Sequence, residues 1–388
     1  MATIYAADGV DVKEGDSFSA FAGRICSESY HNSPFVKVHD LSQRYFRGPR
    51  SFTFQNLPKG YTIDAAPDGI GNKVIIISAV MTHRKAARDL IAMTSGDISR
   101  FGGLPLVFIN VLDVKTLGKS GLDATMSERM VNRAFRDMLE GLGEVCKEQK
   151  LVAFKGETAE LGVCVGSENP DAMVQFNWAG IAIGVYHPGK MITGDSLMPG
   201  QQVVALKEEG FRSNGISSVR KAFQRKFGPH WYRNPEAAQA MMAAAKPSIL
   251  YDRFLCDANG WFSSDFQPKF KIHLIVHITG GAICSKFAKD ILFPRGLSAK
   301  LDGLWKPPVI MRQCAEWRGM GDVECYETWN GGQGVLVVVD QEECEGFITH
   351  AQSYGIPAKQ CGEITREKTP KVVVYSKFNG EKIVFFKK

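Results

Sequence analysis

Short glycine-bearing segments of this sequence place ionisable or amide side chains where a ligand could approach the backbone. The first of them is Asp68-Gly-Ile-Gly-Asn-Lys73. Its two glycines allow close approach of a ligand, its aspartate is a ligand type that divalent cations prefer, and its lysine neutralises phosphate oxygens. The same residues also fit an ordinary Asp-Gly turn, so both interpretations stay open.

Two further acidic segments follow in the N-terminal half. Gly96-Asp97 ends a helical pattern, and Gly156-Glu-Thr-Ala-Glu160 comes directly after the strand pattern Leu151–Phe154. Asp97 either completes a magnesium site with Asp68 or starts a turn. Glu157 is either a ligand of magnesium or substrate, or an ordinary polar residue of a loop.

Three segments of the C-terminal half stand at predicted junctions between strands and helices. Arg212-Ser-Asn-Gly215 precedes a helix, where it either caps the helix or binds an anion such as phosphate. His277-Ile-Thr-Gly-Gly281 ends a strand, and its histidine is either a packed residue or a general acid or base. The glycines of Asn330-Gly-Gly-Gln-Gly334 imply close approach of a ligand or of a neighbouring strand.

Several well-known catalytic signatures are missing from the sequence. It contains no Gly-x-Ser-x-Gly, His-Glu-x-x-His or Gly-x-Gly-x-x-Gly. Gly184-Val-Tyr-His-Pro-Gly-Lys190 has the spacing of a phosphate-binding loop, but Met191 replaces the serine or threonine that would hold magnesium. Pro188 also removes an amide donor, so this segment is interpreted as a turn that ends a strand.

Alternating strand and helix patterns predict an α/β (α+β) protein with two α/β domains, residues 1–192 and 193–388. In the first domain, strand patterns span Lys73–Met81 and Leu104–Val114, and Ser127–Gln149 is the clearest helix, with a capping box at Thr125 and Glu128. The second domain repeats the alternation in strands Gln202–Lys207, Ile272–Ile278 and Val335–Val339, and in helices Ile216–Phe227, Pro235–Phe254, Ala282–Leu292, Pro308–Arg318 and Gln341–Tyr354. Loops are expected at Gly48–Gly60 and Asp257–Pro268.

Composition places the chain among folded globular proteins. Its 388 residues are 44% hydrophobic and 23% charged, and no apolar run approaches the ~18 residues of a membrane span. The nine cysteines are odd in number and form no Cys-x-x-Cys, which fits reduced thiols. The N-terminus lacks a secretory pattern, so the cytoplasm is the expected compartment.

The net charge of +6 gathers at the C-terminus. Between Thr365 and Lys388 basic residues alternate with Val, Tyr and Phe, which is typical of the solvated face of closing strands. An RNA-binding tail is the alternative interpretation, but the chain lacks the aromatic-basic pattern of single-strand binding. We therefore expect no nucleic-acid partner.

The order and spacing of these segments resemble the phosphoribosylformylglycinamidine cyclo-ligase (aminoimidazole ribonucleotide synthetase) family over nearly the whole chain. Besides the segments above, Tyr5-Ala-Ala-Asp-Gly-Val-Asp11 resembles the opening segment of that family, and Gly103-Leu-Pro-Leu-Val-Phe108 resembles its Pro-Leu-Phe-Phe strand. The resemblance implies a homodimer in which two N-terminal sheets close into a barrel, with a C-terminal α/β sandwich in each subunit. It also implies ATP and Mg²⁺ as cofactors.

The reaction implied by the resemblance is ATP-dependent ring closure in purine synthesis. The formyl amide oxygen of formylglycinamidine ribonucleotide is phosphorylated, and the amidine nitrogen then displaces phosphate. By this resemblance, the catalytic residues would be Lys73, Asp97 and His277. The magnesium ligands would be Asp68, Asp97 and Glu157. ATP would contact Asp11, Asp68, Gly69, Gly71, Lys73, Glu157 and Thr158, and the ribonucleotide would contact Arg212, Ser213, Asn214, Gly280, Gly281 and Asn330.

The chain departs from the family pattern at four of these places. Asn72 replaces Thr, Gly96 replaces Asn, Arg212 replaces His and Ala282 replaces a third Gly. Arginine cannot act as a base at neutral pH but can bind phosphate. The alternatives are another ATP-using enzyme of the same superfamily, which includes thiamine monophosphate kinase and selenophosphate synthetase, or a non-catalytic nucleotide-binding paralogue.

Overall fold

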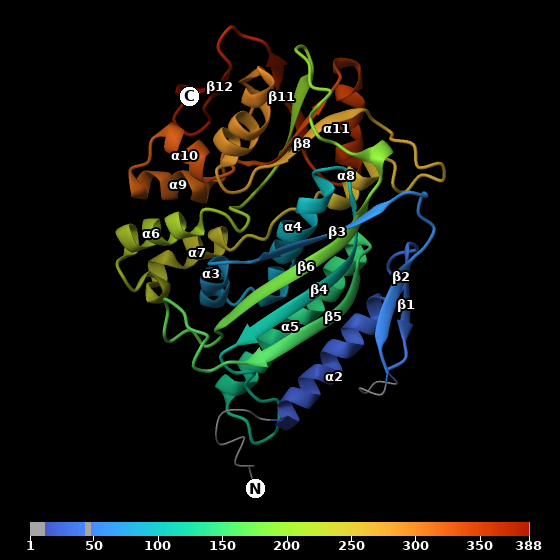
Figure 1. The fold of residues 1–388 in the computed structure, drawn as a ribbon. Helices are drawn as coiled ribbons and strands as arrows, with labels where there is room; N and C mark the ends of the chain where they lie inside the picture. The colour runs from blue at the N-terminus through green and yellow to red at the C-terminus, as the bar shows by residue number, and fades with distance from the viewer. Residues whose placement is uncertain (1–11, 43–47, 388) are drawn as a thin grey trace. The chain divides into compact units, whose positions relative to one another are not determined.

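Three β-sheets organise the residues that the computed structural model describes, 12–42 and 48–387 (Figure 1). The chain divides into two units. The first contains the described residues up to Ile98 together with Leu104–Pro188, and the second contains Ser99–Gly103 and the described residues from Gly189 onward. The sequence pattern predicts the boundary at residue 192. No described helix is long and apolar enough to cross a membrane.

The first unit is built on a four-stranded sheet in the order β3 (Thr62–Gly69), β6 (Phe176–Tyr186), β4 (Leu104–Val114) and β5 (Val152–Glu160). Neighbouring strands are antiparallel except for the parallel pair β4 and β5. Helices α4 (Ala86–Ser99) and α5 (Met126–Gln149) lie behind this sheet in Figure 1. The other elements are α2 (Val12–Ser29), the hairpin β1 (Val36–Asp40) and β2 (Arg50–Phe54), α3 (Lys73–Val80) and η1 (His83–Lys85), and η2 (Pro188–Lys190) spans the boundary to the second unit.

Helix α5 confirms the pattern from which it was predicted. The Thr125 hydroxyl accepts from the Glu128 amide at 3.2 Å, and the Glu128 carboxylate accepts from the Thr125 amide at 2.8 Å. This reciprocal capping satisfies two amide donors that the first turn would otherwise leave unpaired. Behind the cap, the apolar stripe of α5 is buried, including Val131, Phe135, Met138 and Leu142.

Three predicted segments of the first unit were wrong. Lys73–Met81 is not a strand but helix α3, because periodicity cannot distinguish a short apolar run in a strand from one in a buried helix. Gly156–Glu160 is not a loop but the second half of β5, which pairs with β4 as far as Val114 and Glu160. The expected loop Gly48–Gly60 contains β2, whose pairing with β1 is not visible in local composition.

The second unit carries a seven-stranded sheet in the order β13 (Lys382–Phe386), β12 (Lys371–Tyr375), β9 (Ser298–Leu301), β11 (Ala358–Thr365), β7 (Gln202–Lys207), β10 (Gln333–Val339) and β8 (Ile272–His277). Its two faces carry separate cores, which makes it an α/β sandwich. One core includes Phe287 of η5 (Ile283–Leu292), and the other includes Phe254 of α8 (Asp252–Ala258) and Phe347 of α11 (Cys344–Ser353). The remaining elements are α6 (Ile216–Phe227), η3 (Trp231–Arg233), η4 (Pro235–Ala237), α7 (Ala238–Ala244), η6 (Phe293–Arg295), α9 (Val309–Arg318), α10 (Asp322–Thr328) and η7 (Gln341–Glu343).

Two features of this unit bear on the sequence-based expectations. The predicted long helix Pro235–Phe254 is broken into η4, α7 and α8, with Pro247 in the interruption, where a proline removes a helical hydrogen bond. The predicted closing strands are confirmed as β12 and β13, and β13 forms the outer edge of the sheet. Lysines on such an edge discourage pairing with another chain.

Backbone strain is concentrated where η5 begins. Ala282, which stands where the resembled family has glycine, has φ 45° and ψ −140° and is fully buried. That region of backbone space is almost exclusive to glycine, and a residue held in it costs about 1–3 kcal/mol. The π-helix η5 follows at once, so the turn and the helix are joined at a strained residue.

We predict that Ala282→Gly stabilises the protein by about 1 kcal/mol, since relief of strain exceeds the ~0.5–1 kcal/mol of added flexibility in the unfolded chain. Urea denaturation measures the change in the free energy of unfolding. Gly281→Ala is the matched control: Gly281 has φ 79°, and an added Cβ would lie 2.5 Å from the Ser285 Cβ, so this variant should lose stability. An Ala282→Gly protein that is less stable than the parent would contradict the assignment of strain.

Candidate functional site

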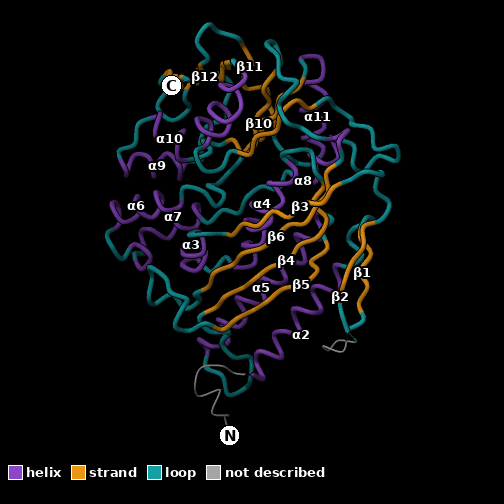
Figure 2. The backbone as a smooth tube through the Cα atoms, viewed as in Figure 1, coloured by secondary structure: helices purple, strands orange, loops and turns teal. Residues whose placement is uncertain are grey.

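Three of the predicted ligand-binding turns meet at one edge of the seven-stranded sheet. Strand β10, which is labelled among the orange strands in Figure 2, runs antiparallel to both β7 and β8, so its first residues lie beside the last residues of β7 and β8. Gln333 pairs with Lys207, and Val335 pairs with His277. The turns that contain Arg212–Asn214, His277–Gly281 and Asn330–Gly334 therefore belong to one surface.

Hydrogen bonds and glycines hold these turns together. The Glu208 amide donates to the Gly332 carbonyl and the Ile278 amide to the Gly334 carbonyl, each at 2.9 Å. A Cβ on Gly334 would lie 2.0 Å from the Tyr251 hydroxyl oxygen, so only glycine fits there. A Cβ on Gly280 would lie 3.8 Å from the Asn214 side-chain oxygen, which brings the second turn against the first.

A buried carboxylate, Glu208, organises the first turn. Its Oε2 accepts from the Arg212 Nη1 at 3.2 Å, from the Tyr251 hydroxyl at 3.3 Å and from the Ile249 amide at 3.3 Å. Arg212 is 1% exposed, and the same Nη1 also donates to the Ile249 carbonyl at 3.2 Å. The guanidinium is thus held inside the protein by Glu208, and phosphate binding by Arg212 stays a prediction.

Sequence reasoning missed Glu208 and Tyr251. An acidic residue at the end of a strand pattern gives no sign that it is buried, and Tyr251 lay inside a predicted helix that the structure interrupts. The signal that could have found Glu208 is its position four residues before Arg212. That spacing becomes informative only once β7 is known to end at Lys207, so that Glu208 and Arg212 belong to the same turn.

His277 is another buried titratable group of this surface. It is 4% exposed, and its Nε2 has no hydrogen-bond partner among the described residues. Burial, followed by the positive charges of Arg212 and Arg100, holds the pKa of His277 well below 6.5. The imidazole is therefore uncharged at neutral pH and can accept a proton.

Two other predicted substrate contacts, Ser213 and Asn330, differ in whether their side chains already have hydrogen-bond partners. The Ser213 Oγ is buried without a hydrogen-bond partner in the described part of the chain, so it is available to a ligand. Asn330, by contrast, donates to the Gly210 carbonyl at 2.9 Å and accepts from the Gly332 amide at 2.8 Å. Its side chain fixes the shape of its own loop, and a direct contact with substrate stays a prediction.

In the first unit, Lys73 lies in a buried ion pair. Its Nζ is 2.7 Å from the Asp89 Oδ1, and the two side chains are 0% and 1% exposed. The pair fastens the start of α3 to α4 directly after the Asp68–Asn72 turn. Lys73 is thus not presented at the surface of the turn, and Asp89 is a second residue that sequence reasoning missed.

The three predicted magnesium ligands are not gathered within the described part of one chain. Asp68 is on edge strand β3 and Glu157 is on the opposite edge strand β5, three strand spacings or roughly 14 Å apart. The Asp97 carbonyl accepts from the Tyr186 hydroxyl at 3.4 Å, and Tyr186 pairs with Thr62 at the far end of β3 from Asp68. No group of three or more His, Cys, Asp or Glu side chains that could hold a metal exists in residues 12–42 and 48–387.

The other predicted ATP contacts occupy the same two strands and the turn after β3. Gly69 ends β3, Gly71 is exposed in the turn that leads to α3, and Thr158 is half-buried in β5 beside the exposed Glu157. Asp11 lies outside the described residues. The described ones among these residues therefore lie at opposite edges of the four-stranded sheet.

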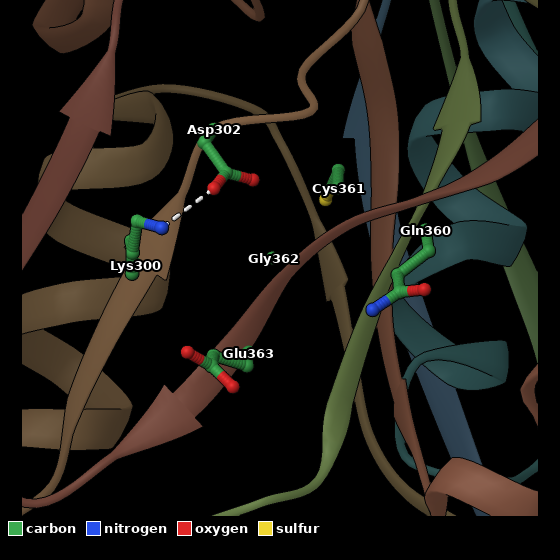
Figure 3. A pocket seen from close by; sticks show the side chains of 6 residues that line it. All are labelled: Lys300, Asp302, Gln360, Cys361, Gly362 and Glu363. Carbon is green, nitrogen blue, oxygen red and sulfur yellow. Dashed lines mark ion pairs between the residues drawn. The ribbon is translucent and has the colours of Figure 1, made fainter.

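A separate hollow on the seven-stranded sheet of the second unit contains none of the predicted site residues. Figure 3 shows its lining, in which the Lys300 Nζ and the Asp302 carboxylate are 2.8 Å apart. The lining residues are Lys300, Asp302, Gln360, Cys361, Gly362 and Glu363. The three turns at the end of β10 are therefore the better candidate site.

Comparison with known proteins gives a consistent result along the chain. Two protein-family models match: "AIR synthase related protein, N-terminal domain" over residues 54–182 and "AIR synthase related protein, C-terminal domain" over residues 198–375. The phosphoribosylformylglycinamidine cyclo-ligase of Desulfotalea psychrophila is 25% identical over 370 residues, with 94% of this chain and 93% of that protein covered. That of Burkholderia cenocepacia strain J2315 is 27% identical over 376 residues, with 94% and 95% covered.

Solved structures share the fold at low sequence identity. A thiamine-monophosphate kinase from Stenotrophomonas maltophilia K279a matches with a TM-score of 0.57 at 12% identity, covering 94% of this chain and 97% of that chain. A hydrogenase maturation protein HypE in complex with ATP matches with a TM-score of 0.53 at 13% identity, covering 90% and 93%. These likenesses concern the arrangement of the elements.

The buried ion pair of the first unit yields a prediction about stability. Asp89→Asn should cost about 3–5 kcal/mol in the free energy of unfolding, because it leaves the Lys73 charge buried without its partner. Lys73→Met combined with Asp89→Leu should cost less than the sum of the single variants. Chemical denaturation measures all three.

Glu28→Gln is the matched control, since Glu28 pairs with Arg24 at 3.8 Å with both side chains more than half exposed. This variant should change stability by less than about 0.5 kcal/mol. An Asp89→Asn variant as mild as Glu28→Gln would contradict the buried pair.

Proposed function

Since this chain belongs to the AIR synthase related family, we propose that it is an ATP-dependent cyclo-ligase that converts formylglycinamidine ribonucleotide to aminoimidazole ribonucleotide, releasing ADP and phosphate. The observation that carries the proposal is the meeting of three turns at the end of β10. Their motifs are those through which the chain resembles that enzyme family. The relatives that bear the enzyme's name cover nearly the full length of this chain.

His277 is the proposed base of the cyclisation. Its neutral imidazole can take a proton from the substrate amidine, whose nitrogen then attacks the formyl carbon as phosphate leaves. The Nε2 is buried without a described partner, so a substrate N–H would satisfy it. Ser213 and Asn214, with the backbone of Gly280 and Gly281, are proposed to hold the ribonucleotide beside it.

ATP is the proposed co-substrate, consistent with the family and with the ATP complex of a protein of the same fold. Asp68, Asp97, Glu157 and the neighbouring turn residues are its proposed contacts. Mg²⁺ is the cation that this chemistry uses in the resembled family, but the described residues of one chain do not form a cation site. No step is therefore derived through it.

A homodimer is part of the proposal, because the four-stranded sheet leaves an apolar face uncovered. Cross-strand partners share a face. Ile181 pairs with Pro67 and Ile109, and Ala179 pairs with Gly69 and Val111. Ile181 is 37% exposed and Val111 is 41% exposed, on the side away from the buried Phe108 and Trp178. A second copy of the same face would bury both.

The reaction is tested by incubating the protein with formylglycinamidine ribonucleotide, ATP and Mg²⁺ and measuring aminoimidazole ribonucleotide and ADP. We expect matched amounts of both products. His277→Gln should lower kcat by about 100-fold or more, because a positioned base contributes 10²–10⁴-fold. As the pH is lowered, the wild-type rate should fall with a midpoint below pH 6.5. The pKa of His277 is lowered, and the imidazole accepts a proton only while it is itself unprotonated.

His187→Gln serves as the control, since His187 is half-buried in the first unit and its Nε2 contacts the Lys59 carbonyl at 3.1 Å. ADP without imidazole would move the protein to another substrate of the same superfamily. Absence of both products, with the protein folded, would favour a non-catalytic paralogue.

Light scattering after size-exclusion chromatography tests the dimer. The wild type should have twice the 42.8 kDa chain mass, and Val111→Asp combined with Ile181→Asp should give the single-chain mass, since burying two carboxylates without partners is costly. Leu122→Asp is the matched control, because Leu122 is 99% exposed in a loop outside this face. A monomeric wild type, or equal dissociation by Leu122→Asp, would contradict the proposed interface.

A further inference from the structure

A serine, a histidine and an aspartate form a hydrogen-bonded chain at the other end of β8 from His277. The Ser196 Oγ is 2.7 Å from the His273 Nδ1, and the His273 Nε2 is 2.8 Å from the Asp340 Oδ1. Ser196 lies in the turn before β7, His273 is the second residue of β8, and Asp340 directly follows β10. His273 lies four residues, or about 13 Å, before His277 along β8.

The aspartate is held so that it orients the histidine. The Asp340 carboxylate also accepts from the Gln201 Nε2 at 3.1 Å and lies 3.3 Å from the Lys271 Nζ. Burial would raise the pKa of Asp340, but the bonds from Gln201, Lys271 and His273 outweigh burial and lower that pKa. An ionised Asp340 accepts the Nε2 proton of His273, so the Nδ1 lone pair faces the serine hydroxyl.

The serine, unlike the histidine, is open to solvent. The His273 side chain is 1% exposed, which fixes its ring, whereas Ser196 is an exposed residue. The hydrogen bonds of the described residues leave the Ser196 backbone amide without an acceptor, so this amide can donate to an oxygen beside Oγ. A nucleophile within reach of a base that a third group orients supports acyl transfer on many unrelated folds; here Nδ1 faces the serine and Nε2 faces the aspartate, the reverse of the usual assignment of the two ring nitrogens.

We propose that Ser196, His273 and Asp340 form a second catalytic site that hydrolyses esters of short carboxylic acids. The Ser196 Oγ attacks the ester carbonyl carbon while the His273 Nδ1 takes the hydroxyl proton. The tetrahedral oxyanion receives the Ser196 amide hydrogen bond. It then collapses, breaking the bond to the alcohol oxygen, and that oxygen leaves with the proton from His273. Water attacks the acyl-serine in the same way, which returns the serine hydroxyl and releases the acid.

The exposure of Ser196 limits the class of substrate. An exposed nucleophile offers little enclosed surface to a long acyl chain, so small activated esters are the expected substrates. The site uses none of the groups placed in the cyclisation. Its failure and the failure of the proposed cyclo-ligase reaction are therefore independent results.

The test uses the full-length protein with a fluorophosphonate probe, which labels activated serines, and with p-nitrophenyl acetate. We expect the probe to modify Ser196, as located by peptide mass spectrometry, and p-nitrophenol release to show an acyl-enzyme burst. Ser196→Ala should abolish both signals with unchanged thermal stability. Asp340→Asn should lower the esterase rate at least 10-fold, and its measured unfolding temperature shows whether the fold survives.

Ser353→Ala is the matched control, because Ser353 is an exposed serine whose hydroxyl donates to the His350 carbonyl at 2.7 Å and meets no imidazole. This variant should keep full labelling and esterase activity. Labelling no greater than that of heat-denatured protein would overturn the proposal. Labelling or turnover that persists in Ser196→Ala would do the same. The chain of hydrogen bonds would then serve only to fasten the turn before β7 to the sheet.

Discussion

The antiparallel placement of β10 between β7 and β8 is the constraint on which the candidate site depends. A strand that runs opposite to both neighbours begins where they end, so its two ladders of backbone hydrogen bonds align three turns that are far apart in sequence. The pairs Gln333 with Lys207 and Val335 with His277 fix this alignment. The same pairing gathers the serine, histidine and aspartate at the opposite edge, so one strand order creates both chemical surfaces of the second unit.

Buried charges then decide which side chains of these turns face a ligand. Glu208 draws the Arg212 guanidinium into the protein, and Asp89 does the same to Lys73 in the first unit. Both basic residues have the type and spacing of phosphate ligands in the sequence. In the structure each one anchors a turn, because a fully buried cation is stable only beside a carboxylate. His277 is left as an uncharged, buried acceptor, and the Ser213 hydroxyl of the neighbouring turn is buried without a partner among the described residues, which suits proton transfer and ligand binding rather than charge neutralisation.

The elements with the longest patterns could be predicted from sequence, and those that depend on distant partners could not. The α5 helix carries its own cap and stripe, and β4 and β7 are long or uniform apolar runs. In contrast, the short apolar run after Lys73 fits a strand or a buried helix equally well, and the contact of Lys73 with Asp89 on α4 is not visible in its local pattern. The continuation of β5 through Gly156–Glu160 depends equally on β4. For the candidate site, the three turns of the second unit could be located, but the roles of Glu208 and Tyr251 arise only from folding, and the carboxylates of the first unit lie on opposite edges of a sheet whose order the sequence does not reveal.

The central claim is that three turns of the second unit form one ribonucleotide site. Hydrogen–deuterium exchange with and without formylglycinamidine ribonucleotide tests it most directly, because it reports on each turn separately and needs no turnover. The account predicts slower amide exchange on ligand addition in peptides that contain Ser213–Gly215, Ile278–Gly281 and Gly331–Gly334 together. Protection of only one of these turns, or protection confined to the first unit, would contradict it.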